Sequence, residues 1–560
     1  MKDAVSDFVF RMTGGNKAVA ELCAEAVACL EEGDVCLPLD EERSALLASV
    51  PGVAFFAAAD TPPGAVRTPF VVGPDPGGAA GLLYTRRNWV YERRVRDWIL
   101  GRIGAPPADS VPELPDEPFY NGLRDEQRDA VLAMCNSRFS ILTGGPGTGK
   151  THTIARAVKF VLDRRPEFRL GLAAPTGKAK ARMAESLEKA VKDLGFDVPQ
   201  ASTIHSLLGP KPDFVTFKHD RNNPLSLDWL VVDEASMVDL PLMAKLLDAL
   251  PDSCRLTLVG DADQLASVER GRVFGDLCRF PGVPVSRLGQ SARFPPDGDI
   301  AKLAAAVNGK DADGAMAVLG DRSDVVSFVD LARLSKDDAF DPEKWPGFAD
   351  RVLAGFATFA GGPNGKDGEP EDPVEFALAH LNDFRVLCAL RHGPFGSEQV
   401  ARWIKKRLPR NSPVPMMVTK NDRGLGVENG DVGVVMPDDP KTLRLPGGRN
   451  VRLELLPDPE LAFASTVHKA QGSEFDDVAI VLPPNPSGKK PGKDAPPDGG
   501  AASAEGEEEG NACKLLTREI LYTAITRTKK TVALWGSAEA VRHCALNGIS
   551  RRSGLVFPAP

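Results

Sequence analysis

The sequence predicts an α/β protein organised around a P-loop nucleotide site, and three consecutive features carry that prediction. Residues 140–143 are a short, partly β-branched apolar run typical of a buried strand. Residues 144–151 then fit G-x-x-x-x-G-K-[ST], and residues 153–162 have apolar side chains at helical spacing. In this order the glycines turn backbone N–H groups toward phosphate oxygens, and the helix N-terminus adds a favourable dipole. A chance glycine-rich turn is the alternative, and the flanking strand and helix weigh against it.

The P-loop residue types predict ATP and Mg²⁺ as ligands. Lys150 is placed to reach the β- and γ-phosphates, and the Thr151 hydroxyl to hold Mg²⁺. Gln127 lies slightly upstream, and its amide both donates and accepts, so it is a candidate for reading the adenine edge. An ordinary surface glutamine is the alternative. The residues expected to cradle the nucleotide are Gly144, Gly145, Pro146, Gly147, Thr148, Gly149, Lys150 and Thr151.

Later strands end in polar residues suited to hydrolysis. The strand at 227–232 is followed by Asp233 and Glu234. Asp233 is placed to hold Mg²⁺ through its water shell, and Glu234 to orient the attacking water. The strand at 255–260 is followed by Gln264, a candidate sensor of the γ-phosphate.

Two arginines are candidates for stabilising the transferred charge. Arg293 precedes an acidic turn, and an ordinary surface arginine is the alternative reading there. Arg527 lies at the end of a helical stretch and is the better arginine-finger candidate than Arg518.

Composition bounds the class of protein. A chain of 560 residues should hold roughly three or four domains. The net charge of −9 argues against a generally basic nucleic-acid coat but leaves room for a local basic groove. Nine scattered cysteines without a C-x-x-C pair suit reduced thiols and suggest no zinc or iron–sulfur site. With no signal-peptide pattern and no run near ~18 apolar residues, we expect a soluble cytoplasmic protein.

Changes in composition and in hydrophobic periodicity divide the chain into segments. Residues 1–108 read as a mostly helical docking domain with strand-like pieces at 33–39 and 81–92, followed by a proline-rich linker. Short β-like runs between 413 and 461 predict a small β-barrel insertion. Residues 321–375 look like an insertion or linker, with 361–373 flexible by composition. Residues 483–513 look like a disordered insertion, because they are rich in Pro, Gly, Ala and Glu.

Eight motifs in order resemble those of superfamily 1B helicases, and specifically the RecD family, the alpha subunits of exodeoxyribonuclease V. The resemblance runs from about residue 120 to the end and implies two RecA-like domains with ATP in the cleft between them. It places the first at 109–320 with a pin-like hairpin at 209–227, the second at 376–412 and 462–560, and an SH3-like element at 413–461. The motifs are Gln127; Gly144–Thr151; Ala174–Ala179; Asp233–Ser236; Gly260–Leu265; Ser291–Phe294; Thr466–Phe475; and Tyr522–Arg527.

The resemblance implies an ATP-dependent 5′→3′ DNA helicase. It would be the motor subunit of a RecBCD-type helicase and nuclease, acting with RecB and RecC on duplex DNA ends in recombinational repair, with the nuclease centre outside this chain. Thr151 and Asp233 would bind the metal. The implied hydrolytic residues are Lys150, Asp233, Glu234, Gln264, Arg293 and Arg527, and the implied single-stranded DNA contacts are Thr176, Lys178, Thr466 and His468.

Other functions stay open at this point. A stand-alone RecD-like helicase would carry N-terminal helix–hairpin–helix repeats, and no such G-x-G repeats precede residue 110. An ATP-gated subunit that binds DNA ends without moving is disfavoured by the intact Lys150, Glu234 and Arg527. A relaxase–helicase would need clustered histidines, and the seven here are dispersed. Backbone contacts do not distinguish DNA from RNA.

Overall fold

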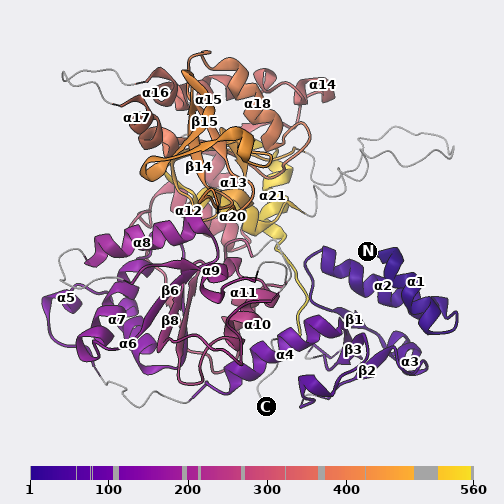
Figure 1. Cartoon of the computed structure of the whole chain (residues 1–560). Coiled ribbons are helices and arrows are strands. Elements are labelled where there is room, and N and C mark those ends of the chain that lie inside the picture. Colours follow the sequence, from indigo (N-terminus) through magenta and orange to yellow (C-terminus); the bar gives the residue numbers. More distant parts are fainter. Residues whose placement is uncertain are drawn as a thin grey trace, which may run out of the picture.

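The chain folds into an N-terminal domain, two α/β domains and a small β insert, as the computed structural model shows (Figure 1). We call the two α/β domains the first and second motor domain, after the role that the sequence resemblance implies. The structure describes residues 2–58, 60–75, 77–78, 80–104, 113–191, 199–211, 216–266, 271–321, 323–362, 372–422, 424–484 and 515–555. The predicted insertion at 483–513 lies almost wholly outside these residues. Within the described part of the chain, no helix is both long and apolar enough to span a bilayer.

The N-terminal domain is mostly helical, as predicted, and also contains a four-stranded sheet of order β1-β4-β3-β2. The strand-like reading of 81–92 is correct only to Thr85, where a helix begins. Trp89, Glu92 and Val95 recur at helical spacing and are buried along one face. The elements are α1 (Lys2–Met12), α2 (Lys17–Glu31), β1 (Leu37–Leu39), α3 (Glu41–Ala48), β2 (Ala54–Phe56), η1 (Pro63–Ala65), β3 (Phe70–Gly73), β4 (Gly81–Thr85) and α4 (Arg86–Leu100).

The first motor domain is a six-stranded parallel sheet of order β10-β5-β9-β8-β6-β7 between helices. The P-loop strand β5 lies inside this sheet, next to β9 and β10. The elements are α5 (Pro118–Asn121), α6 (Asp125–Asn136), β5 (Phe139–Gly144), α7 (Lys150–Arg164), β6 (Leu170–Ala174), α8 (Gly177–Val191), β7 (Ser202–Thr203), α9 (Ile204–Leu208), β8 (Trp229–Val232), η2 (Ala235–Met237), α10 (Leu240–Asp248), β9 (Arg255–Gly260), α11 (Val273–Leu277) and β10 (Val285–Leu288).

The second motor domain is a five-stranded parallel sheet of order β11-β20-β19-β12-β18, so the fold has the two RecA-like units that were predicted. The elements are α12 (Asp299–Asn308), α13 (Ala312–Gly320), β11 (Val326–Asp330), α14 (Lys336–Ala339), η3 (Pro342–Lys344), α15 (Phe348–Gly355), α16 (Ala357–Gly361), α17 (Pro373–Ala379), η4 (His380–Asn382), β12 (Phe384–Cys388), α18 (Ser397–Arg407), β18 (Ala464–Thr466), η7 (His468–Ala470), β19 (Phe475–Val481), α20 (Arg518–Thr526), β20 (Thr528–Gly536) and α21 (Ala538–Leu546).

Residues 326–359 belong to the hydrophobic core of the second motor domain. Their packing differs from the insertion or linker that was expected at 321–375. β11 pairs with β20 as an edge strand of the sheet. Trp345 and Phe348 are buried against Trp535 and other aromatic side chains, and this apolar surface fixes the segment onto the sheet. Residues 363–371 lie outside the described part of the chain.

A five-stranded antiparallel sheet of order β16-β15-β14-β13-β17, with its own apolar core, forms the predicted β insert. Its SH3-like character stays a prediction. So does the pin-like hairpin, of which an antiparallel bridge between Pro210 and Phe217 lies in the described part. The insert comprises β13 (Val414–Met417), β14 (Val432–Met436), β15 (Asp439–Leu445), η5 (Pro446–Gly448), β16 (Arg449–Arg452), η6 (Leu453–Leu455) and β17 (Glu460–Leu461).

Candidate functional site

The P-loop is a glycine turn between β5 and α7. Gly147 and Gly149 have φ of 77° and 90°, which non-glycine residues rarely adopt. A Cβ on Gly147 would lie 2.5 Å from Arg293 Cβ, so the loop tolerates no side chain there. Lys150 Nζ donates to the carbonyl oxygens of Gly144 (2.7 Å) and Gly145 (3.1 Å), folding back over its own loop. These carbonyls hold the ammonium at the mouth of the turn.

A cavity of about 250 Å³ opens beside the P-loop, between the two motor domains. All six predicted hydrolytic residues line it: Lys150, Asp233, Glu234, Gln264, Arg293 and Arg527. β5, β8 and β9 deliver their residues from the first sheet, because the carboxyl ends of parallel strands meet at one edge. Arg527 comes from the second domain, at the end of α20. The cavity is therefore complete only when both domains contribute.

The two carboxylates after β8 are closely constrained. Glu234 has a φ of 50°, a strained value for a non-glycine residue that is typical of functional sites. Burial raises the pKa of Asp233 to about 6, the adjacent Glu234 carboxylate adds to the rise, and the Lys150 ammonium opposes it. A cation beside Asp233 would favour its charged form.

Gln264 is joined to both motor domains. Its Nε2 donates to Asp261 Oδ2 (3.0 Å), and the Tyr522 hydroxyl of the second domain donates to the same oxygen (3.3 Å). The Leu265 N–H, next in the chain, donates to Thr523 Oγ1 (3.1 Å). This cluster connects the end of β9 to α20, the helix that Arg527 caps at its C-terminus.

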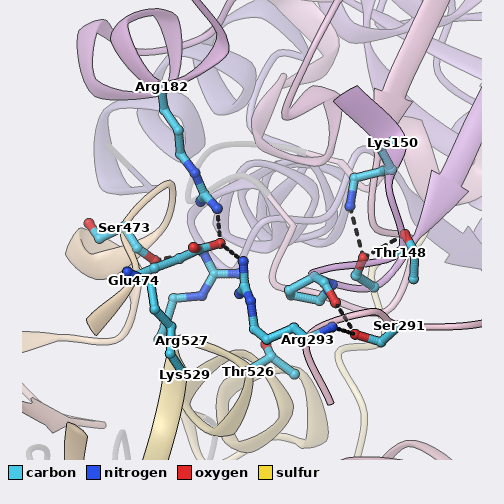
Figure 2. Close-up of polar contacts among 12 residues, drawn as sticks. Thr148, Lys150, Arg182, Ser291, Arg293, Ser473, Glu474, Thr526, Arg527 and Lys529 are labelled. Carbon is cyan, nitrogen blue, oxygen red and sulfur yellow. Dashed lines mark hydrogen bonds and ion pairs between the residues drawn. The ribbon is translucent and has the colours of Figure 1, made fainter. Parts of the chain in front are cut away.

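Three guanidinium groups surround the cavity, and one carboxylate separates two of them (Figure 2). Arg293 Nη2 donates to Glu474 Oε1 at 2.5 Å, and Arg182 forms an ion pair with the same oxygen. Arg527 Nη1 donates to the Ser473 carbonyl (3.2 Å). Burial lowers the pKa of Arg293 to about 10, and the nearby Arg182 and Arg527 charges add to this.

Arg182 and Glu474 are cavity residues that the sequence prediction missed as site residues. Arg182 follows Lys178 by one helical turn on α8, and this spacing was the available signal. Glu474 lies within the motif Thr466–Phe475, but no local pattern in the sequence shows that it faces two arginines from other elements.

The residues present fit a nucleoside triphosphate with Mg²⁺. Arg293 Nη1 and Arg527 Nε are buried without a hydrogen-bond partner, so the cavity wall carries donors for an anion. Thr151 and Asp233 line the same cavity and offer the oxygen ligands that Mg²⁺ prefers. The described residues contain no cluster of three or more His, Cys, Asp or Glu side chains that could hold a metal ion.

Gln127 is buried against the P-loop and does not line the cavity. Its Oε1 accepts from the Arg124 N–H (3.2 Å), and its Nε2 donates weakly to the Thr148 carbonyl (3.4 Å). In this conformation its amide fastens the loop, and adenine reading stays a prediction.

The four predicted DNA contacts lie outside the cavity, just past β6 and at the end of β18. Thr176 Oγ1 accepts from the Ala179 N–H (3.2 Å), and Thr466 Oγ1 from the Lys469 N–H (3.4 Å). Burial lowers the pKa of Lys178 to about 7, with the Arg385 and Arg182 charges adding to the fall. Burial also lowers the pKa of His468 to about 4, so its imidazole is neutral at pH 7.

Comparison with known proteins matches the site and most of the chain. The family model described as an AAA domain matches residues 127–270. The RecBCD enzyme subunit RecD of Mycolicibacterium smegmatis is 36% identical over 501 residues, covering 85% of this chain and 81% of that protein. The RecBCD enzyme subunit RecD of Haemophilus influenzae is 31% identical over 551 residues, covering 85% and 80%. The ATP-dependent RecD2 DNA helicase of Deinococcus radiodurans is 29% identical over 482 residues, covering 82% and 56%.

Proposed function

The chain belongs to the RecD family, and from this premise we propose that it is the ATP-driven DNA helicase subunit of a RecBCD-type enzyme. It would move 5′→3′ along single-stranded DNA from duplex ends, in the cytoplasm, together with RecB and RecC. The observation that carries the proposal is the cavity at the junction of two RecA-like sheets, lined by Lys150 and Glu234 from one domain and Arg527 from the other. Such a site changes its electrostatics when the domains close.

The proposed hydrolytic roles follow from the positions of the side chains. Lys150 Nζ exchanges its two carbonyl partners for phosphate oxygens, a stronger charge-assisted pairing. Glu234 orients the attacking water, and Gln264 reports the terminal phosphate to α20 through Asp261 and Tyr522. Arg293 and Arg527 stabilise the charge on the transferred phosphoryl group. Mg²⁺, held by Thr151 and Asp233, would neutralise phosphate charge.

The proposed domain roles use the boundaries predicted from the sequence. Residues 1–108 serve as the docking domain for the partner subunits. Residues 109–320 and the two segments 376–412 and 462–560 act as the motor domains, and 413–461 as the β insert. Thr176, Lys178, Thr466 and His468 contact the DNA backbone from both motor domains, which suits stepping that is independent of sequence.

The test is strand separation on 5′-tailed and 3′-tailed duplexes by the purified chain, alone and with RecB and RecC. We expect ATP-dependent unwinding from 5′ tails. Lys150→Ala should abolish ATP hydrolysis and unwinding without changing the melting temperature, because it removes the phosphate contact at the cavity wall. Lys189→Ala, which changes a lysine on the exposed end of α8, is the matched control and should behave as wild type.

Unwinding only in the three-subunit assembly would identify an obligate motor subunit. Retained DNA-stimulated hydrolysis in Lys150→Ala would refute the assignment of the site. Absence of unwinding in both settings would favour a DNA-end-binding structural subunit instead.

A further inference from the structure

An acidic side chain of the β insert lies on the first turn of α8. Glu428, in the loop between β13 and β14, places its Oε1 at 3.3 Å from Lys180 Nζ, although the two residues are 248 positions apart. A Cβ added to Gly177, the first residue of α8, would overlap Glu428 Oε2. The carboxylate therefore rests directly against the helix N-terminus.

This turn is also the place of two proposed DNA contacts. Thr176 precedes α8, and Lys178 is its second residue. The N-terminus of a helix has unpaired N–H groups and a positive dipole end, so it attracts a carboxylate or a phosphate for the same reason. Glu428 thus lies where a phosphate of the DNA backbone would bind.

The contact leaves a buried carboxylate oxygen unsatisfied and a half-buried lysine without a direct partner among the described residues. Glu428 Oε2 is buried and has no hydrogen-bond partner. In the part of the chain that the structure describes, Lys178 Nζ makes no ion pair or hydrogen bond, and it is surrounded by the Arg385, Arg182 and Asp431 charges. Buried polar groups without partners are costly. A DNA phosphate beside Lys178, with Glu428 released to water, would satisfy both groups.

The loop that presents Glu428 is built by its own hydrogen bonds. The Glu428 N–H donates to Asp431 Oδ2 (3.1 Å), and the Gly430 N–H donates to the Val418 carbonyl (2.9 Å). Gly430 has a φ of 94°, which a glycine adopts without strain. The insert therefore fixes the backbone at Glu428 independently of α8.

We propose that Glu428 is an autoinhibitory contact, which occupies the phosphate position on α8 in the DNA-free chain and is displaced when single-stranded DNA binds. This inference rests on the proposed function, because it assumes that the start of α8 contacts the DNA backbone. It adds that the β insert sets the threshold for DNA binding.

The experiment measures binding of a fluorescent single-stranded oligonucleotide to the full chain, without nucleotide, by anisotropy at several salt concentrations. Glu428→Gln keeps the size of the side chain and removes its charge, so we expect its affinity to rise at least fivefold over wild type. Glu428→Asp, with a shorter side chain, should lie between the two. The gain should shrink as salt rises, because competition between anions is electrostatic and screened.

Glu454→Gln is the matched control, since Glu454 lies on the same insert with 69% of its side chain exposed, and its affinity should equal that of wild type. Wild-type affinity in Glu428→Gln, or weaker binding, in a chain that does bind DNA would overturn the inference and leave the proposed function standing. Absence of DNA binding by wild type and variant, alone and with RecB and RecC, would overturn both.

Discussion

Raising the pH should loosen the C-terminal segment 551–555, which we name the C-terminal strap, from the N-terminal domain. The strap follows α21 and runs from the second motor domain along the N-terminal domain (Figure 1). Glu92 on α4 accepts hydrogen bonds from the Ser553 hydroxyl and the Gly554 N–H, both at 3.1 Å, and from the Tyr84 hydroxyl at 2.9 Å. The Val35 N–H also donates to the Arg552 carbonyl (2.9 Å).

The magnitude follows from the burial of Glu92. Burial raises the pKa of Glu92 from 4.5 to about 7, against the lowering effect of its three donors. If undocking returns this carboxyl to water, the docked state gains stability that is fully present below pH 4.5 and is lost as the pH rises through 7. Between pH 5 and pH 8 this amounts to about 2–3 kcal/mol, or on the order of 100-fold in the opening equilibrium.

Hydrogen exchange measured by mass spectrometry on the C-terminal peptide, corrected for intrinsic rates, gives the opening equilibrium at each pH. Burial also raises the pKa of Asp34 and Asp276, so part of the pH dependence persists in any Glu92 variant. Glu92→Gln should remove about 2–3 kcal/mol of the change between pH 5 and pH 8. Glu41→Gln, on an exposed position of α3, should keep the wild-type profile. An identical pH profile in Glu92→Gln and wild type would refute the reasoning.

Two substitutions test the hydrophobic core of the second motor domain and the hydrolytic roles proposed for the cavity beside the P-loop. Phe348→Ala removes a fully buried ring that contacts Trp345, Trp403 and Trp535. We therefore expect the free energy of unfolding of this domain, measured by tryptophan fluorescence in urea, to fall by about 3–5 kcal/mol. A fall below about 1 kcal/mol would mean that this segment is peripheral to the core. Arg527→Lys keeps a positive charge but loses the planar donor geometry, so ATP hydrolysis should fall roughly 100- to 1,000-fold while nucleotide affinity stays within about tenfold. Hydrolysis near the wild-type rate in a steady-state assay would remove Arg527 from the proposed mechanism.

The sequence alone determined the features whose cause is local. The P-loop was predictable because strand, glycine turn and helix follow one another within 25 residues, and each has its own pattern. The two RecA-like units were implied by the resemblance to the RecD family. The small β insert was predictable from its short β-like runs separated by Asn-Gly and Gly-Gly turns. Arg527 lines the cavity while Arg518 pairs with Glu519, and the arginine-finger role of Arg527 stays a prediction.

Local patterns failed where burial depended on distant residues. Residues 321–375 were predicted to be an insertion or linker, but Trp345 and Phe348 pack against apolar partners on strands much later in the chain. Gln127 was predicted to read the adenine edge, and its hydrogen bonds to Arg124 and Thr148 could not be predicted from its spacing in the sequence.

Only the tertiary structure decided which charged groups meet. Glu474 lies between Arg182 and Arg293, Glu428 rests on the first turn of α8, and Glu92 holds the C-terminal strap. Each pair joins residues more than 150 positions apart in the sequence. A single charged residue has no periodicity, so its partner is fixed by how the domains pack and not by the residues around it.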